Sequence, residues 1–345
     1  YRGFAVRQDW MKNLNLKEPA TIEELYNILK SFTEGDPDKN NSKDTIGLTM
    51  YGEPVWEATA TGQDFFWSLY DLPNEYIEKD GQVVYSPVHK NAKEMLRFLN
   101  RLYKEGILDK EFAVNKEDTV AQKLSSGRAG AMDIYWWNLK KWEPTLNGIA
   151  GERGFWYIKP PKTFEGKDLK YKQFGPQDSF RVVSKGSKHP AEAIDFLNKL
   201  LDPAIAETMT FGFKGEHWNE KDGKVELTEK YKDIVYLWYY RDNLYYRWDM
   251  MEKSENLEYG PWRIPCLEWT GGSETWNVLD KITPLVDMQQ QINDIREYTK
   301  QEYYKFILGE RNVDAEFDKF VEEWKSKGGE QVLKAVQDAY VKAKQ

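Results

Sequence analysis

Oxygen-bearing side chains alternate along one short stretch of the sequence. Asp36, Asp38, Asn40 and Asp44 occupy positions 1, 3, 5 and 9 of a polar loop. An EF-hand-type site uses this early alternation to surround Ca²⁺ with oxygen ligands, which suit this hard cation better than zinc. Position 6 is asparagine rather than glycine, and position 12, Gly47, lacks the bidentate glutamate of such sites. The spacing leaves two interpretations open, a Ca²⁺ site and a solvated turn rich in Asp and Asn.

Side chains for nucleophilic or zinc chemistry form no recognisable motif. His89, His189 and His217 stand apart from one another and outside any hydrolase signature. The single cysteine, Cys266, cannot form an internal disulfide, and one thiol with three histidines is too few for a structural zinc site. Residues 127–130 lack the Lys-Ser/Thr of a phosphate-binding loop. Since 57 acidic residues supply many carboxylate pairs, a glycoside hydrolase is neither supported nor excluded.

Aromatic residues are unusually frequent for so polar a chain. Trp, Tyr and Phe make up 15% of the residues, 14 of them Trp, although the mean hydropathy is −0.76. Trp is large and rarely fully buried, so some of these rings are expected to face a ligand. The alternative for any one Trp is half-buried surface packing.

The charge balance limits the classes of partner. The 345 residues carry a formal net charge of −8 and a sequence pI of about 5.3. This balance argues against nucleic acid as the main partner, and it provides no general attraction to anionic lipid. No run of 18 apolar residues occurs, and residues 1–8 do not resemble a signal peptide, so we expect a cytoplasmic protein or a mature or truncated form.

Hydrophobic spacing indicates alternating helices and strands. A capping box at Thr21–Glu24 opens one helix, and further helices are expected from Asn91, through Val120 and from Pro190. Two short apolar runs are predicted strands, residues 129–134 and 180–183. Beyond Thr228 the pattern is mainly helical, with segments 292–308 and 317–340, the latter interrupted at Gly328 and Gly329. This order predicts an α/β architecture of two or three domains or lobes.

Five segments in order resemble the family 1 extracellular solute-binding proteins, the carbohydrate receptors of ABC importers. The similarity is greatest to the large lipoprotein branch of Gram-positive bacteria and more distant to maltose-binding protein. The segments span nearly the whole chain: Val6–Leu16 with Pro19–Leu25, Asp36–Asp44, Leu124–Met132, Phe211–Trp218, and Phe306–Glu310 with Phe317–Trp324 and Gly328–Gly329.

The resemblance implies a type II periplasmic-binding-protein fold, a clamshell of two α/β lobes that closes by a hinge motion. The segment at residues 7–10 follows most of the first lobe in such proteins, so most of the N-terminal lobe is expected to be absent from this chain. Residues 1–175 and 213–345 would form the C-terminal lobe, and residues 176–212 would be a crossover segment that contributes to the N-terminal lobe.

The resemblance also implies ligands for both kinds of site. Members of the branch bind a structural Ca²⁺ through residues that match Asp36, Asp38, Asn40, the Ser42 carbonyl and Asp44, whereas Thr45 replaces the family's usual acid. The residues that match sugar contacts are Glu53, Trp56, Trp136, Trp137 and Trp276. Gln177 and Asp178 lie at the predicted crossover and are candidates for hydrogen bonds to sugar hydroxyls. Indoles suit the apolar face of a sugar ring, and carboxylates and amides suit its hydroxyls.

The implied function is non-catalytic binding of an oligosaccharide outside the cell, and delivery of this sugar to ABC transporter permease subunits. The protein would be a monomer attached to the outer face of the membrane only through a lipid anchor outside this chain. Two alternatives remain. A glycan-active hydrolase would use a carboxylate pair, and a sugar-sensing accessory protein would report to a signalling receptor.

Overall fold

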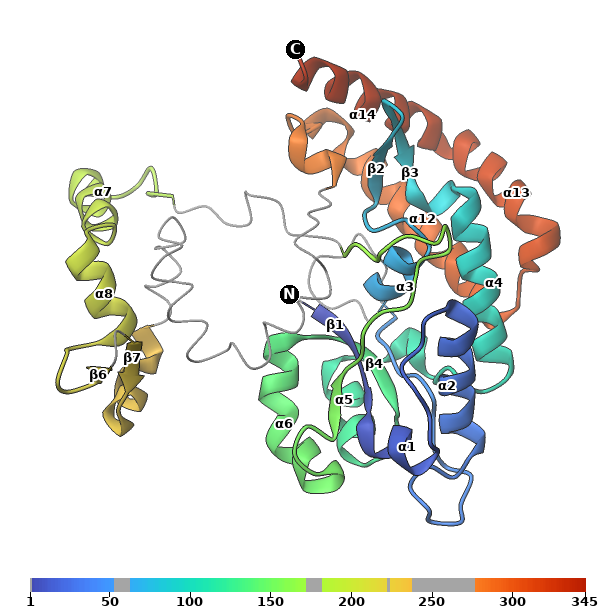
Figure 1. Ribbon diagram of the computed structural model, residues 1–345. Coiled ribbons are helices and arrows are strands. Elements are labelled where there is room, and N and C mark those ends of the chain that lie inside the picture. Colours follow the sequence, from blue (N-terminus) through green and yellow to red (C-terminus); the bar gives the residue numbers. More distant parts are fainter. Residues whose placement is uncertain (1, 53–62, 172–181, 222–223, 238–276) are drawn as a thin grey trace. The chain divides into compact units, whose positions relative to one another are not determined.

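The computed structural model describes residues 2–52, 63–171, 182–221, 224–237 and 277–345 (Figure 1). The chain divides into two compact units. The first comprises Tyr1–Pro176 and Pro265–Gln345, and the second comprises Gln177–Ile264. Which clamshell lobe each unit represents stays a prediction.

A three-stranded antiparallel sheet organises the first unit. Its central strand β1 (Arg2–Arg7) pairs with β4 (Ala131–Tyr135) on one side and with β5 (Phe155–Tyr157) on the other. Every residue of β1 and β4 is buried, which fits the predicted strand at residues 129–134. The register places Arg2 opposite Tyr135 and Phe4 opposite Asp133. Charged side chains therefore enter the interior from two neighbouring strands.

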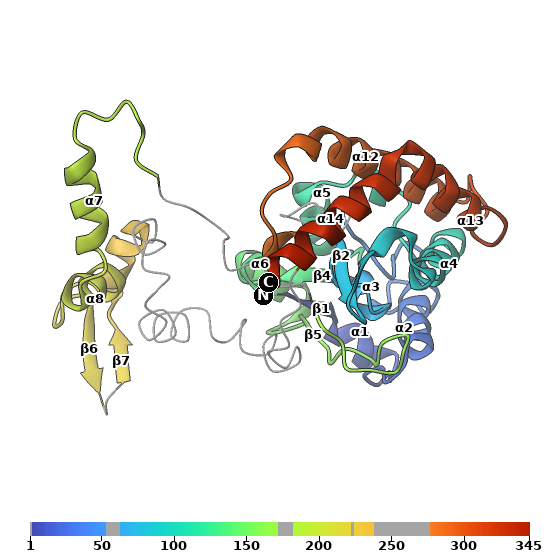
Figure 2. The ribbon, with the colours of Figure 1, turned by 90° about the horizontal axis from the view of Figure 1, so that it is seen from above.

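Helices surround this sheet, and three of them come from the far end of the chain. Figure 2 shows the C-terminal helices α12, α13 and α14 along one side of the unit, near α4. The bounds are α1 (Gln8–Asn13), α2 (Ile22–Glu34), α3 (Asp64–Leu69), α4 (Lys90–Lys104), α5 (Glu117–Ser125), α6 (Trp136–Ala150), α12 (Gln289–Leu308), α13 (Val313–Trp324) and α14 (Glu330–Ala343). A hairpin of β2 (Tyr76–Lys79) and β3 (Gln82–Tyr85) packs against α14.

The predicted helices of this unit are confirmed in type and place. Thr21 caps α2 through a reciprocal capping box with Glu24. The interruption predicted at Gly328 is a kink with φ of 101° between α13 and α14. Gly130 allows a close approach, because a Cβ there would lie 2.5–2.8 Å from the rings of Phe32 and Trp10. These two rings, from α1 and α2, meet edge-on at 5.4 Å beside the residue that precedes β4, and both belong to the same hydrophobic core as Ala131.

The second unit contains α7 (Pro190–Lys199), α8 (Pro203–Phe211), the hairpin β6 (Trp218–Lys221) and β7 (Lys224–Leu227), and the 3₁₀ segment η3 (Glu229–Leu237) (Figure 2). It reaches beyond the predicted segment 176–212, because later residues pack on α8. The Trp218 indole donates a 3.1 Å hydrogen bond to the Gly212 carbonyl, and the Tyr231 hydroxyl donates one of 3.3 Å to the Thr210 carbonyl.

The strand predicted at residues 180–183 is absent from its described part. Val182 and Val183 are not in a strand, and Val182 is 85% exposed, while residues 180 and 181 lie outside the described residues. Among the helices of the described ranges, none has the length and apolar character needed to cross a membrane.

Candidate functional site

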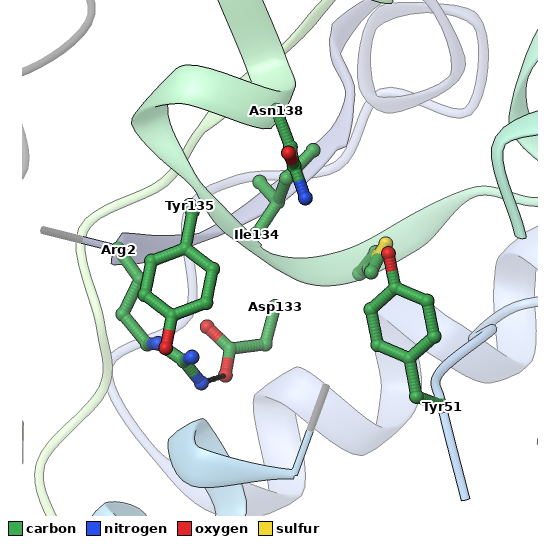
Figure 3. Close-up of a pocket in the computed structure, with 7 residues that line it drawn as sticks. Arg2, Tyr51, Asp133, Ile134, Tyr135 and Asn138 are labelled. Atoms are coloured by element: carbon green, nitrogen blue, oxygen red, sulfur yellow. Dashed lines mark hydrogen bonds and ion pairs between the residues drawn. The ribbon is translucent and has the colours of Figure 1, made fainter. Parts of the chain in front are cut away.

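A small hollow opens in the first unit where β4 runs into α6 (Figure 3). It holds about 170 Å³ of empty space including its opening, less than the roughly 300–1,000 Å³ of a complete ligand pocket. The lining residues are Arg2, Tyr51, Met132, Asp133, Ile134, Tyr135 and Asn138. The hollow is thus a shallow depression rather than a complete pocket, and we call its lining residues the wall.

A buried ion triad forms the base of this wall. The Arg2 guanidinium contacts the Asp64 carboxylate at 2.7 Å and the Asp133 carboxylate at 3.0 Å, and all three side chains are at most 6% exposed. Burial opposes the charge of Arg2, but the two carboxylates outweigh it and raise the pKa of this guanidinium. The three residues come from β1, from the start of α3 and from β4, so the triad joins segments that are distant in sequence.

Asp64 and Asp133 share the single cation of Arg2, and this sharing affects the hydrogen bonding and the pKa of Asp133. One of its oxygens, Oδ2, accepts from Arg2 and from the backbone N–H of Phe65 at 3.0 Å. The other, Oδ1, is buried and has no hydrogen-bond partner in the described part of the chain. Burial, together with the negative charge of Asp64, raises the pKa of Asp133 to about 7 although Arg2 opposes the shift.

Aromatic rings extend the wall outward from the triad. The Arg2 guanidinium carbon lies 3.9 Å from the centre of the Tyr135 ring, and burial raises the pKa of Tyr135 to about 12. Tyr135 stacks on Trp137 with ring centres 4.1 Å apart and an interplanar angle of 12°. Trp136 meets Trp137 edge-on at 5.5 Å. Trp137 is 38% exposed, so an indole stacked beside the hollow remains available to a ligand.

The structure describes only some of the predicted sugar contacts. Trp136 and Trp137 form the first turn of α6 and contact each other, with Trp136 half-buried. Five further predicted contacts lie outside the described residues: Glu53, Trp56, Gln177, Asp178 and Trp276. Tyr51 lines the hollow, and Asp64 pairs with Arg2.

Sequence analysis did not identify Arg2, Asp133 or Asn138 as site residues. A signal was present for Asp133, which is a charge inside an otherwise apolar predicted strand. Buried charges are paired or functional, so Asp133 implied a partner somewhere in the fold. Arg2 begins β1, which was not predicted as a strand. Nothing local marked Asn138, which lies in the first turn of α6, directly after β4.

The oxygen-rich loop is exposed and held by its own hydrogen bonds. Asp36 accepts from the backbone N–H groups of Asn40 at 3.0 Å and Asn41 at 3.2 Å. The Asn40 amide donates to Asp38 at 2.9 Å and to Asp44 at 3.3 Å, so both carboxylates converge on one amide nitrogen. Burial raises the pKa of Asp38, and the charge of Asp44 acts in the same direction.

Two positions of this loop provide no side-chain ligand. The Thr45 hydroxyl is buried and donates to the Phe32 carbonyl at 2.7 Å. At Gly47 a Cβ would lie 2.2 Å from the Leu29 carbonyl oxygen, so no larger residue fits. Within the described ranges, no three or more His, Cys, Asp or Glu side chains are grouped as a metal site. Ligands from this loop would be the Asp and Asn oxygens together with backbone and water.

Comparison with known proteins gives a family match. The sequence model for bacterial extracellular solute-binding proteins matches residues 1–207. The chain is 26% identical to the polygalacturonan/rhamnogalacturonan-binding protein YtcQ of Bacillus subtilis strain 168, over 99% of this chain and 68% of that protein. It is 25% identical to lipoprotein LipO of the same strain, over 98% of this chain and 68% of LipO.

Among solved structures, one similar chain is the substrate-binding protein FusA of Streptococcus pneumoniae, an EF-hand mutant in complex with fructo-nystose. The TM-score is 0.67 at 16% identity, and the match covers 99% of this chain and 72% of FusA. At that identity the likeness concerns the fold alone, and it confirms the predicted α/β fold class of solute-binding proteins.

Proposed function

Because the chain belongs to the family of bacterial extracellular solute-binding proteins, we propose that it binds an oligosaccharide outside the cell and delivers it to the permease of an ABC transporter. One observation carries the choice of a sugar. The half-exposed Trp137 stacks on Tyr135, and Tyr135 lines a hollow that also holds carboxylate and amide groups. A sugar needs this pairing of an apolar surface with hydrogen-bonding groups.

Transport requires that sugar binding change the conformation that the permease recognises. A sugar that contacts both lobes of a clamshell favours the closed form by its differential affinity for the two forms. The protein would act as a monomer, with Trp136, Trp137 and the predicted contacts Glu53, Trp56, Gln177, Asp178 and Trp276 at the sugar. Attachment through a lipid anchor outside this chain is supported by the name of its relative LipO, a lipoprotein.

We also propose a structural Ca²⁺ ion at the loop, held by Asp36, Asp38, Asn40, the Ser42 carbonyl and Asp44. Support comes from the convergence of Asp38 and Asp44 on one amide group of Asn40, a point at which a cation would neutralise both carboxylates. The description of FusA names an EF-hand, which supports a Ca²⁺ site of this kind. The bound ion would supply a local charge that holds the loop closed.

A second candidate function has a specific observation in its favour. The raised pKa of Asp133 is a property of general acids in glycoside hydrolases, and Asp64 provides a neighbouring carboxylate. Both carboxylates, however, are committed to Arg2, and the family consists of binding proteins. A binding protein returns its sugar unchanged, whereas a hydrolase releases shorter products.

One experiment tests these functions together. The full-length protein is screened by thermal shift against fructo-, gluco- and manno-oligosaccharides and a galacturonan oligomer, and each sugar is analysed by chromatography afterwards. We expect one class of sugar to raise the melting temperature and to be recovered intact. Shortened products would establish the hydrolase, and no shift with any sugar would reject oligosaccharide binding. Copurification with a permease or a sensor kinase then separates transport from signalling.

A further inference from the structure

Asn138 is a polar residue of the wall whose side chain forms no hydrogen bond within the described part of the chain. It lies in the first turn of α6, directly after Trp136 and Trp137, and its side chain is half-buried. Figure 3 shows its amide directed from α6 toward the space that Tyr135 and Tyr51 flank. Its side-chain amide has no hydrogen bond to another described residue.

Other sheltered asparagines of this unit differ in that respect. Asn100 donates to the carbonyls of Phe306 and Ile307 at 2.9 and 3.0 Å. Asn115 donates to Asp109 at 2.8 Å and to the Met50 carbonyl at 3.2 Å. These amides stabilise the fold through both distant and nearby contacts. The amide atoms of Asn138 are accessible and bond no described residue, so its donors and acceptor are available to a partner that arrives from outside.

A second, independent feature of the hollow also points to a ligand. Asp133 lines the same space and is 2% exposed, and its Oδ1 atom lacks a hydrogen-bond partner in the described ranges. The cation beside it is already shared between two carboxylates, which leaves this wall with no net positive charge to attract an acid. The wall thus combines the unpaired amide of Asn138 with the buried carboxylate of Asp133. A ligand that offers hydroxyl groups suits this wall better than a ligand that offers carboxylates.

We propose that Asn138 is a specificity-determining residue that recognises an uncharged sugar. Its amide N–H donates to one hydroxyl and its carbonyl accepts from the adjacent hydroxyl of a ring stacked on Trp137. The inference rests on the proposed function and deepens it, because it assigns a residue and the uncharged class of sugar. Two such hydrogen bonds correspond to a loss of about tenfold in affinity when the amide is removed.

Two substitutions separate recognition from folding. Asn138→Ala removes the amide, and alanine is favourable within a helix. Asn138→Asp keeps the shape and the acceptors but loses the donors, and it places a negative charge in the first turn of α6, where such a charge favours the helix. A structural role for the amide would lower the melting temperature of the free protein in both variants. The proposal expects neither variant to lower it, while both bind sugar about tenfold more weakly.

Asn147 provides the matched control on the same helix. Its Oδ1 accepts from the backbone N–H of Arg153 at 3.2 Å, and it does not line the hollow. Affinities of the full-length wild-type protein, both Asn138 variants and Asn147→Ala are measured by calorimetry with the fructo-, gluco- and manno-oligosaccharides and with the galacturonan oligomer. We expect an uncharged sugar to bind the wild type and Asn147→Ala equally well.

Each other outcome has a definite meaning. Unchanged affinity in Asn138→Ala would overturn the role of Asn138 while leaving sugar binding intact. Wild-type binding of the galacturonan oligomer alone would overturn the uncharged class. Binding of no sugar by the wild type would reject the proposed function, and the role of Asn138 with it.

Discussion

The wall of the hollow and the oxygen-rich loop both carry acidic groups, but they hold them in opposite ways. In the wall, Asp64 and Asp133 are buried and fixed by Arg2 from another strand. In the loop, Asp36, Asp38 and Asp44 are within nine residues of one another, and short-range hydrogen bonds order them. The wall therefore depends on the whole fold, whereas the loop depends mainly on its own sequence.

The largest effect is expected at the buried Arg2, which lies between two buried acids, Asp64 and Asp133. Arg2→Met should lower the free energy of unfolding by about 3–5 kcal/mol, because two buried carboxylates lose their partner. Arg97→Met is the control, since Arg97 is 41% exposed and bonds Glu94 and Asp314 at the surface. It should cost below about 1 kcal/mol. Urea unfolding measures the free energy of both variants. Equal losses of stability would contradict the difference between the buried and the exposed arginine.

The shared cation also predicts a pH dependence. Between the ordinary pKa of an aspartate and the folded value of about 7, the folded protein holds a proton on Asp133 that the unfolded chain has released. This contribution to stability is therefore lost as the pH rises from 5 to 8, by about 2–3 kcal/mol. Urea unfolding across that range measures the slope, and Asp133→Asn should flatten it. A variant with the wild-type slope would assign the titration elsewhere.

The loop should respond to metal where the wall does not. If Ca²⁺ binds, free Ca²⁺ at ten times its dissociation constant should add about 1.4 kcal/mol to the free energy of unfolding. A chelator should lower the melting temperature, and Asp38→Asn with Asp44→Asn should abolish the response. Arg2→Met should keep it. No response of the wild-type melt to chelator or Ca²⁺ would sink the metal proposal.

The smallest effect is expected at the aromatic edge of the wall. Trp137→Ala should weaken sugar binding by about 1 kcal/mol, or roughly fivefold, because one stacking surface is lost. Trp136→Ala should weaken it as well, and neither should alter the calcium response. Trp156→Ala is the control, because Trp156 is on β5 and its ring packs against Tyr157 and Arg153. Wild-type affinity in both Trp136 and Trp137 variants would remove these indoles from the sugar site.

The features that could be predicted from the sequence are the local ones. A few adjacent residues determine the capping box at Thr21 and the break at Gly328, and the structure contains both features. The alternation from Asp36 to Asp44 was visible for the same reason. The triad was not predicted, because residues 2–7 were not predicted as a strand and the contacts of Arg2 depend on how β1, β4 and α3 pack. Periodicity identifies a strand, but it does not say which strand lies beside it.

The stacked Tyr135 and Trp137 rings have a spectroscopic consequence. Two aromatic chromophores 4.1 Å apart and nearly parallel couple electronically, and a fixed asymmetric surrounding gives them a near-ultraviolet circular dichroism signal. A ligand that packs against the exposed face of Trp137 should alter that signal. The difference spectrum between the wild type and Trp137→Ala isolates it from the remaining indoles. The Tyr135–Trp137 pair can therefore report ligand binding at the wall through its circular dichroism signal, without an attached dye.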